Sequence, residues 1–312
     1  MSFETTLHEL GDGLFAYIQG DGGWGFSNAG LVTAPGTSML IDTTFDRRCA
    51  ERMLAELAPI TSERPIESAA NTHGNGDHCF GNASLPDRIP VYATKAADDE
   101  LRVVTPQVLT LLEHIDDSAE WRSYWARTFG RFDFAGTELR LPTDTFAGRL
   151  DVKVGDREVA IIEVGPAHTA GDAILVVPDA ETVFTGDILF SNGTPIVWQG
   201  PIQNWLDACE QIESLHPRTL VPGHGPLRGT DGLADTKRYL NYIRDQARAR
   251  HAQGMSAAEA ADDIDISDFR DWGDPERIVV NVETAYRELE PGRPSPPPPD
   301  LFLGMARWAA RH

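Results

Sequence analysis

Six residues from His73 to His78 constrain this chain more than any other segment. They read His-Gly-Asn-Gly-Asp-His and follow Ile66–Ala70, a short run typical of a β-strand. Because glycine adopts backbone conformations closed to other residues, Gly74 and Gly76 allow the loop to turn sharply and bring its side chains together. Imidazole and carboxylate are ligands that a borderline divalent cation accepts. The segment therefore indicates a metal site at the end of a strand.

Three further candidate ligands occupy matching positions later in the chain. His168, Asp187 and His224 each lie at the end of a strand-like run, beside glycine or proline. A single histidine after a strand is usually a hydrogen-bonded structural residue. Four histidines and two aspartates in such loops favour a metal site over that interpretation. The candidate metal ligands are His73, Asp77, His78, His168, Asp187 and His224.

The rest of the pattern predicts strands that alternate with helices, which is typical of an α/β architecture. A proline-rich segment at 291–299 is expected to be extended, and a short apolar helix is expected at 301–310. The expected strands cover residues 13–18, 29–33, 37–42, 66–70, 157–164, 173–177, 182–184 and 219–221, and the expected helices cover 47–57, 205–215, 233–253, 256–262 and 275–289.

Residues 95–134 are predicted to form a helical, aromatic-rich insertion. Aromatic residues recur there at intervals of three and four, as on one face of a helix. The simpler interpretation is a stripe of buried core, and the alternative is a lid over a substrate pocket. Trp24 stands at the tip of a glycine-rich loop, residues 20–25. The candidate pocket residues are Trp24, Phe26, Trp198, Trp121 and Trp125.

Charge and cysteine content narrow the possible partners. Lysine and arginine number 27 and aspartate and glutamate 48, which gives a net charge of −21. Such a charge repels nucleic acid and anionic membranes. The three cysteines do not form a disulfide framework, and no leader or membrane-spanning segment is recognisable. We therefore expect a cytoplasmic protein that acts on a small molecule, with a homodimer possible through the last helix.

The ordered ligand set resembles the metallo-beta-lactamase superfamily, whose motif is His-x-His-x-Asp-His followed by His, Asp and His. The resemblance extends over about residues 11–225 and implies an αββα sandwich with the metal site at one edge. A looser resemblance, in segments 20–24, 71–78, 186–195 and 277–286, links the chain to actinobacterial thioesterase/cyclase-like members of aromatic polyketide pathways. The implied organisation is a catalytic domain at 1–230, a helical extension of it at 231–290, and a tail at 291–312.

The chain departs from this motif at Asn75, which stands where the family has its second histidine. An amide oxygen is a much weaker zinc ligand than imidazole, so the metal position that it serves should be weakened. The resemblance implies a first metal position held by His73, residue 75 and His168, and a second held by Asp77, His78 and His224, with Asp187 bridging the two.

Three outcomes are open for the metal. Two ions bind, with Asn75 a poor ligand or replaced by water. Alternatively, only the second position fills. The third outcome is a single ion held by His73, His168 and Asp187, a set that suits non-haem iron and resembles the persulfide dioxygenases of this superfamily. The expected cofactor is one or two zinc ions, with iron or manganese as alternatives.

The leading hypothesis is a metal-dependent hydrolase of an ester, thioester or lactone bond in a small apolar or aromatic metabolite. A bound divalent ion lowers the pKa of water to about 7 and polarises a carbonyl group. The predicted catalytic residues are Asp77, which would orient the nucleophile or carry its proton, and Asn75, which would donate to a substrate oxygen. The alternatives are a polyketide-type cyclase or lyase, an iron oxygenase, and a non-catalytic binding protein with a decayed site.

Two more aspartates have candidate supporting roles. Asp42, at a strand end, either hydrogen-bonds a ligand histidine or terminates the strand in a turn, and Asp172 is expected to position the His168 loop. Cys79 follows the last histidine of the motif directly and is expected to be a packed small hydrophobe.

Overall fold

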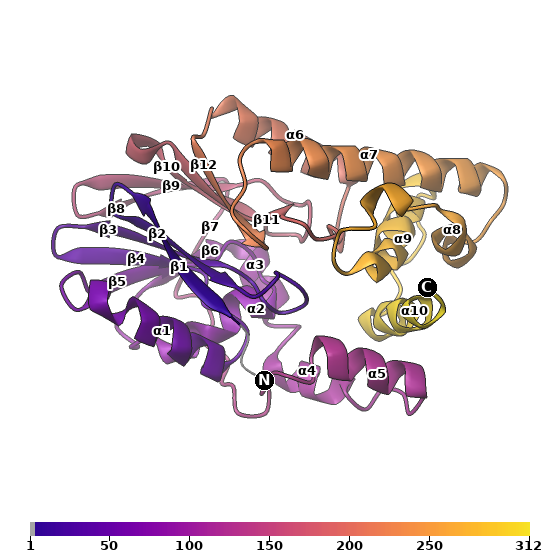
Figure 1. The fold of residues 1–312 in the computed structure, drawn as a ribbon, viewed down its shortest axis with the longest axis horizontal. Helices are drawn as coiled ribbons and strands as arrows, with labels where there is room; N and C mark the ends of the chain where they lie inside the picture. The colour runs from indigo at the N-terminus through magenta and orange to yellow at the C-terminus, as the bar shows by residue number, and fades with distance from the viewer. Residues whose placement is uncertain (1–3) are drawn as a thin grey trace.

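Two β-sheets lie face to face between layers of helices in the computed structural model, which describes residues 4–312 (Figure 1). The first sheet has the order β1-β2-β3-β4-β5-β6-β7 and the second the order β12-β11-β10-β9-β8. The expected αββα sandwich is confirmed. The strands are β1 (Thr5–Gly11), β2 (Leu14–Gln19), β3 (Ala29–Ala34), β4 (Thr37–Ile41), β5 (Ile66–Ala70), β6 (Val91–Thr94), β7 (Asp144–Phe146), β8 (Arg149–Val154), β9 (Arg157–Glu163), β10 (Ala173–Val177), β11 (Thr182–Phe190) and β12 (Thr219–His224).

Alternation along the strands divides the core into layers. In β2, Leu14 and Ala16 belong to the apolar cluster between the two sheets, whereas Phe15 and Tyr17 belong to the cluster on the outer face. Met53 of α1 packs into that outer cluster. Strand β2 is thus buried on both faces.

Helices cover both outer faces of the sandwich (Figure 1). The first sheet carries α1, whose N-terminus is capped by Asp46, and the second carries α6 and α7. Two 3₁₀ turns, Phe80–Ser84 and Pro275–Arg277, lead into later segments. The helices are α1 (Arg47–Thr61), α2 (Gly76–Cys79), α3 (Lys95–Leu101), α4 (Pro106–Leu112), α5 (Ala119–Thr128), α6 (Ile202–Ser214), α7 (Asp231–Ala252), α8 (Ala257–Asp263), α9 (Ile278–Leu289) and α10 (Pro298–Arg311).

The expected helical insertion consists of α3, α4 and α5, and α10 packs beside α5 (Figure 1). Each insertion helix begins at a threonine or serine whose hydroxyl accepts a backbone N–H. The last helix therefore docks on the chain itself. Within residues 4–312, no helix is both long enough and apolar enough to cross a membrane.

The structure differs from the sequence expectation at β1, β6, β7, β8 and β11. Strand β8 alternates charged residues outward and β1 is largely exposed and polar, so neither has the apolar run by which strands were recognised. Strand β11 continues to Phe190 instead of ending at residue 184, and its pairing with β12 is irregular around Gly186. Asp187 therefore projects from within a strand rather than from a loop.

Candidate metal centre

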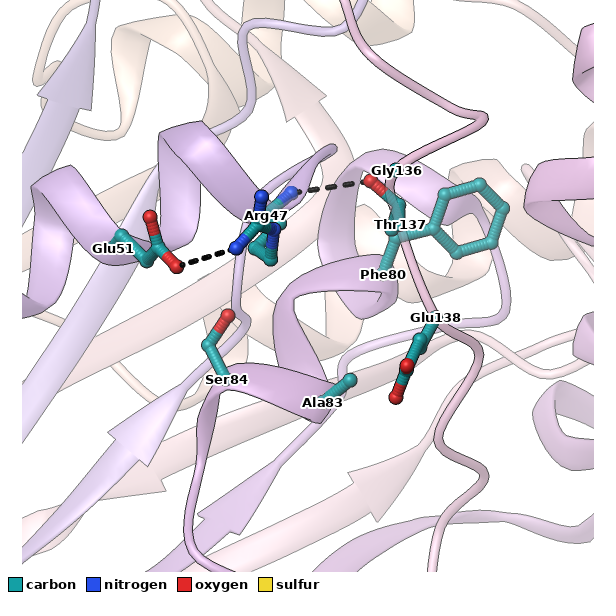
Figure 2. Close-up of a pocket in the computed structure, with 8 residues that line it drawn as sticks. All are labelled: Arg47, Glu51, Phe80, Ala83, Ser84, Gly136, Thr137 and Glu138. Atoms are coloured by element: carbon teal, nitrogen blue, oxygen red, sulfur yellow. Dashed lines mark hydrogen bonds and ion pairs between the residues drawn. The ribbon is translucent and has the colours of Figure 1, made fainter.

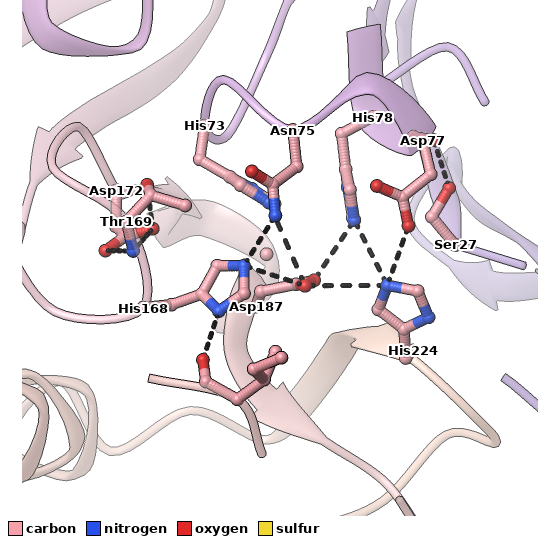
Figure 3. Close-up of polar contacts among 12 residues, drawn as sticks. Ser27, His73, Asn75, Asp77, His78, His168, Thr169, Asp172, Asp187 and His224 are labelled. Atoms are coloured by element: carbon pink, nitrogen blue, oxygen red, sulfur yellow. Dashed lines mark hydrogen bonds and ion pairs between the residues drawn. The ribbon is translucent and has the colours of Figure 1, made fainter. Parts of the chain in front are cut away.

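The six candidate ligands converge at one edge of the sandwich (Figure 3). The 71–78 segment leaves β5 and begins the one-turn helix α2, while His168 lies on the loop between β9 and β10. Asp187 and His224 come from the parallel strands β11 and β12. Figure 3 shows Asp187 between two groups of side chains, each of which combines residues of the 73–78 segment with one histidine from a later part of the chain. We call these groups the tight half, Asp77, His78 and His224, and the loose half, His73, Asn75 and His168.

The tight half has the spacing of a metal site. His224 Nε2 lies 3.2 Å from Asp77 Oδ2 and 3.4 Å from His78 Nε2. Asp187 adds one oxygen 3.1 Å from His78 Nε2 and another 3.5 Å from His224 Nε2. Ligands about 2.1 Å from a tetrahedral ion stand about 3.4 Å apart. The three residues of the tight half therefore have the spacing of ligands to one divalent ion, and Asp187 lies beside them.

One buried atom in the centre, His73 Nε2, lacks a hydrogen-bond partner within the described chain. It lies 3.8 Å from Asp187 Oδ2, and both side chains are almost completely buried. A buried lone pair without a partner costs free energy unless an ion takes it. This unpaired atom is a second observation that fits a metal centre.

When no ion is bound, the histidines of the two halves differ in protonation. Burial alone would lower the pKa of His224, but the carboxylates of Asp187 and Asp77 outweigh it and raise the pKa to about 9. Burial would also lower the pKa of His78. The carboxylates of Asp187 and Asp42 outweigh this effect and raise the pKa well above its ordinary value. In the loose half, burial lowers the pKa of His168 to about 4. Protons thus occupy the tight half, where an ion would replace them.

Each histidine is oriented through its other ring nitrogen. His78 Nδ1 lies 2.8 Å from Asp42 Oδ2, so the prediction that Asp42 contacts a ligand histidine is confirmed. His224 Nδ1 donates to the carbonyl of Gly22 at 2.9 Å, and His168 Nδ1 donates to that of Ile196 at 2.7 Å. These contacts point the Nε2 atoms into the centre.

Two features of the surrounding loops allow the candidate metal-ligating side chains to reach the centre. A Cβ atom on Gly223 would stand 2.0 Å from Asp187 Oδ1, so only glycine lets this carboxylate reach the centre. Asp172 accepts hydrogen bonds from the backbone N–H groups of Ala167 and Thr169 and from the Thr169 hydroxyl. These bonds confirm that Asp172 holds the His168 loop.

A family model of the metallo-beta-lactamase superfamily matches residues 22–224, which contain all six candidate ligands. The chain belongs to this superfamily. The match ends at His224, so the helices α7 to α10 lie outside it.

The superfamily relatives include several hydroxyacylglutathione hydrolases. One from Cereibacter sphaeroides is 32% identical over 123 residues, which is 38% of this chain and 48% of the relative. One from a Synechococcus species is 26% identical over 189 residues, covering 59% of this chain and 57% of the relative. The chain thus spans about half the length of these curated relatives.

Solved structures share the fold at low sequence identity. A stereoselective inverting sec-alkylsulfatase from Pseudomonas sp. has a TM-score of 0.67 at 16% identity, with 94% of this chain and 52% of that chain covered. The metallo-beta-lactamase FIM-1 from Pseudomonas aeruginosa, in its mono-zinc form, has a TM-score of 0.56 at 18% identity, with 75% of this chain and 94% of that chain covered. At these identities the likeness concerns the fold alone.

The candidate pocket residues of this superfamily member do not form one group. Trp24 and Trp198 are half-buried with ring centroids 6.5 Å apart, and the backbone N–H of Trp198 donates to the carbonyl of His168. Phe26 is buried and packs on Phe132. Trp121 is completely buried and Trp125 nearly so; both stand in the apolar core with the rest of the α5 stripe.

Sequence reasoning missed Phe302 of α10 and Glu276. The ring of Phe302 lies 6.1 Å from that of Trp24 and 5.6 Å from that of Trp198, and Glu276 accepts a hydrogen bond from the Trp24 indole at 3.0 Å. Neither residue stands in a recognisable motif. Their contacts could not be predicted from local sequence, because Trp24 and Glu276 are more than 250 residues apart in the chain.

A surface depression of about 280 Å³ lies away from the ligands, between the start of α1 and the 136–138 loop (Figure 2). Its most polar wall is the exposed ion pair of Arg47 and Glu51, 3.3 Å apart. None of the six candidate ligands lines it. We assign the chemistry to the metal centre instead.

Proposed function

We propose that this protein is a metal-dependent hydrolase of thioester or ester bonds in small apolar molecules. The observation that carries the proposal is the tight half, in which His224 Nε2 lies 3.2 Å from Asp77 Oδ2 and 3.4 Å from His78 Nε2, a spacing that suits ligands of one tetrahedral ion, with Asp187 beside them. The hydroxyacylglutathione hydrolases among its relatives support a thioester, because that is the bond their name describes. When bound, a zinc-like ion acidifies water and polarises a carbonyl group.

Asp77 is the residue of this centre best placed to move a proton. Its side chain is 15% exposed, whereas the other ligand carboxylate, Asp187, is 3% exposed. Burial alone would raise its pKa, but His78 and His224 lower the pKa to about 2, so the carboxylate is ionised at neutral pH. Ser27 donates a hydrogen bond to the Asp77 backbone carbonyl and fixes the segment that carries it. Asp77 can therefore accept a proton at the edge of the centre.

The surroundings of the centre favour an apolar acyl group. Trp24 and Trp198 are half-buried, and each lies close to a ligand loop: the 20–25 loop also carries the Gly22 carbonyl, and Trp198 is bonded to His168. Aromatic faces bind apolar and aromatic groups through large contact areas. We therefore place the substrate's acyl group against these two indoles.

The experiment is a hydrolysis assay on zinc-loaded protein with matched thioester and oxygen-ester substrates of aromatic and of short polar acyl groups. We expect thiol release, fastest for aromatic acyl thioesters, and no oxygen uptake. Asp77→Asn should lower kcat by about 100-fold or more, since general acid–base catalysis contributes 10²–10⁴-fold.

The matched control is His114→Ala, which changes an exposed histidine outside the centre and should leave the rate unchanged. Oxygen consumption without hydrolysis, or an unchanged rate in Asp77→Asn, would contradict the proposal. Equal rates for aromatic and short polar acyl groups would contradict the proposed preference for apolar substrates, whereas the proposal of a hydrolase would stand.

A further inference from the structure

His168 presents a lone pair, not a proton, to the centre. Its Nδ1 lies 2.7 Å from the carbonyl oxygen of Ile196, and because a carbonyl only accepts, Nδ1 carries the hydrogen. With the ring neutral, Nε2 is an acceptor. It lies 3.4 Å from Asp187 Oδ2, so it faces the ion position of the loose half.

Asn75 already occupies that lone pair. Its Nδ2 lies 3.0 Å from His168 Nε2, and an amide nitrogen donates (Figure 3). The reverse orientation would set the amide oxygen against the lone pair, two acceptors face to face. Asn75 is the N-cap residue of α2, yet its side chain makes no capping bond, so it is free to point into the centre.

The two halves therefore offer an ion different numbers of donors. The tight half offers Asp77, His78 and His224, together with an oxygen of Asp187. The loose half offers His73 Nε2 and the shared Asp187, because the Nε2 of His168 is hydrogen-bonded to an amide. His73 and Asp187 also form a group with His78, but the single free Nε2 of His78 can serve only one ion, and in the tight half it already does so. Zinc sites need three or four protein ligands, so two donors hold an ion poorly.

We infer that the chain retains one metal ion, held in the tight half, and that Asn75 disables the other position by hydrogen-bonding His168. This inference rests on the metal centre of the proposed function. It also removes the set of His73, His168 and Asp187 as an iron site, since one of its two imidazoles is not available. Asn75 thus acts as a cap on a ligand rather than as a ligand.

Zinc content after exhaustive dialysis tests the inference without any substrate. Full-length wild-type protein should retain about one zinc per chain, and Asn75→His should retain about two, because the added imidazole restores a donor and frees His168. His168→Ala should still retain one, whereas His224→Ala should retain none. Circular dichroism establishes that each variant is folded. Asn75→Ala serves as a second variant and should retain more zinc than the wild type, because it frees His168 as a third donor beside His73 and Asp187.

The outcomes separate this inference from the proposed function. Two retained zinc ions in the wild type, or loss of the ion in His168→Ala, would overturn the inference while leaving a metallo-hydrolase. Absence of zinc from the wild type after loading would overturn both. Substitution with cobalt gives a second readout, because its visible absorption distinguishes four-coordinate from six-coordinate ions and should be unchanged in His168→Ala.

Discussion

The tight and loose halves of the metal centre each contain two histidines, but they differ in what contacts the ligand nitrogens that face the ion position. In both, each imidazole is oriented from behind, by Asp42 and Gly22 in the tight half and by Ile196 in the loose half. Only the loose half has an amide in front, where Asn75 bonds His168. A single side chain in one loop can therefore change how many ions a centre takes while the fold and the supporting contacts stay in place.

The largest expected effect comes from breaking the tight half. His224→Ala removes a donor that stands 3.2–3.5 Å from the three others, so the ion and the hydrolytic activity should be lost together. The loose-half counterpart, His168→Ala, should keep its ion and lower kcat much less. Zinc content and hydrolysis rates of both variants test this contrast. Equal losses of zinc and activity in the two variants would show that the two halves do not differ in function.

A second comparison uses the two supporting aspartates. Asp42→Asn weakens the contact that orients His78 and should lower zinc affinity by about 10- to 100-fold, the usual cost of losing such a partner. Asparagine also tolerates the positive φ of this residue, so the backbone is kept. Asp172→Asn, behind the loose half, should leave the affinity unchanged. Competition titrations with a chromogenic chelator give both values.

The two halves should also respond to pH in opposite directions once the metal is removed. The pKa of His224 is raised from 6.5 to about 9, so its stabilising charge is fully present below pH 6.5 and is lost as pH rises to 9. The pKa of His168 is lowered to about 4, so the unfolded chain takes up a proton first and stability falls as pH drops from 6.5 to 4.

Thermal unfolding of chelator-treated protein between pH 4 and 9 should therefore show highest stability near pH 6.5. His224→Gln should flatten the alkaline limb and His168→Gln the acid limb, by up to about 3 kcal/mol each. Zinc-loaded protein should lack the alkaline fall, since the ion replaces the proton. Because the pKa of His78 is also raised, part of the alkaline fall should survive in His224→Gln. An alkaline fall of unchanged size in this variant would contradict the assignment to His224.

The smallest expected effect is at the contact between the 20–25 loop and the C-terminal helices. Glu276→Gln keeps an acceptor for the Trp24 indole but removes the charge, at a cost of about 1 kcal/mol. The Tm should fall by about 2–4 °C with the zinc content unchanged. Loss of zinc in this variant would mean that the tight half depends on the C-terminal helices for its ion.

The convergence of the six candidate ligands could be predicted because their signal is local. They stand in segments that contain glycine or proline after an apolar run, and parallel strands such as β11 and β12 bring such segments to one edge. The hydrogen bond from Asn75 to His168 could not be predicted, since it depends on the relative placement of two loops 93 residues apart. Periodicity alone did not distinguish the buried Trp121 from the half-buried Trp198, because burial depends on tertiary packing and not on the neighbouring residues in the sequence.

The pairing of Trp24 with Glu276 and Phe302 has a consequence for the order in which the chain matures. During synthesis all six ligands have been made by residue 224, 52 residues before Glu276. Until the segment 276–302 follows, Trp24 lacks its contacts with Glu276 and Phe302, although the Gly22 carbonyl of the same loop already faces His224. Domains tend to fold as their N-terminal parts emerge. In this chain the far end therefore adds the last contacts to a loop beside a metal centre whose six candidate ligands have already been made.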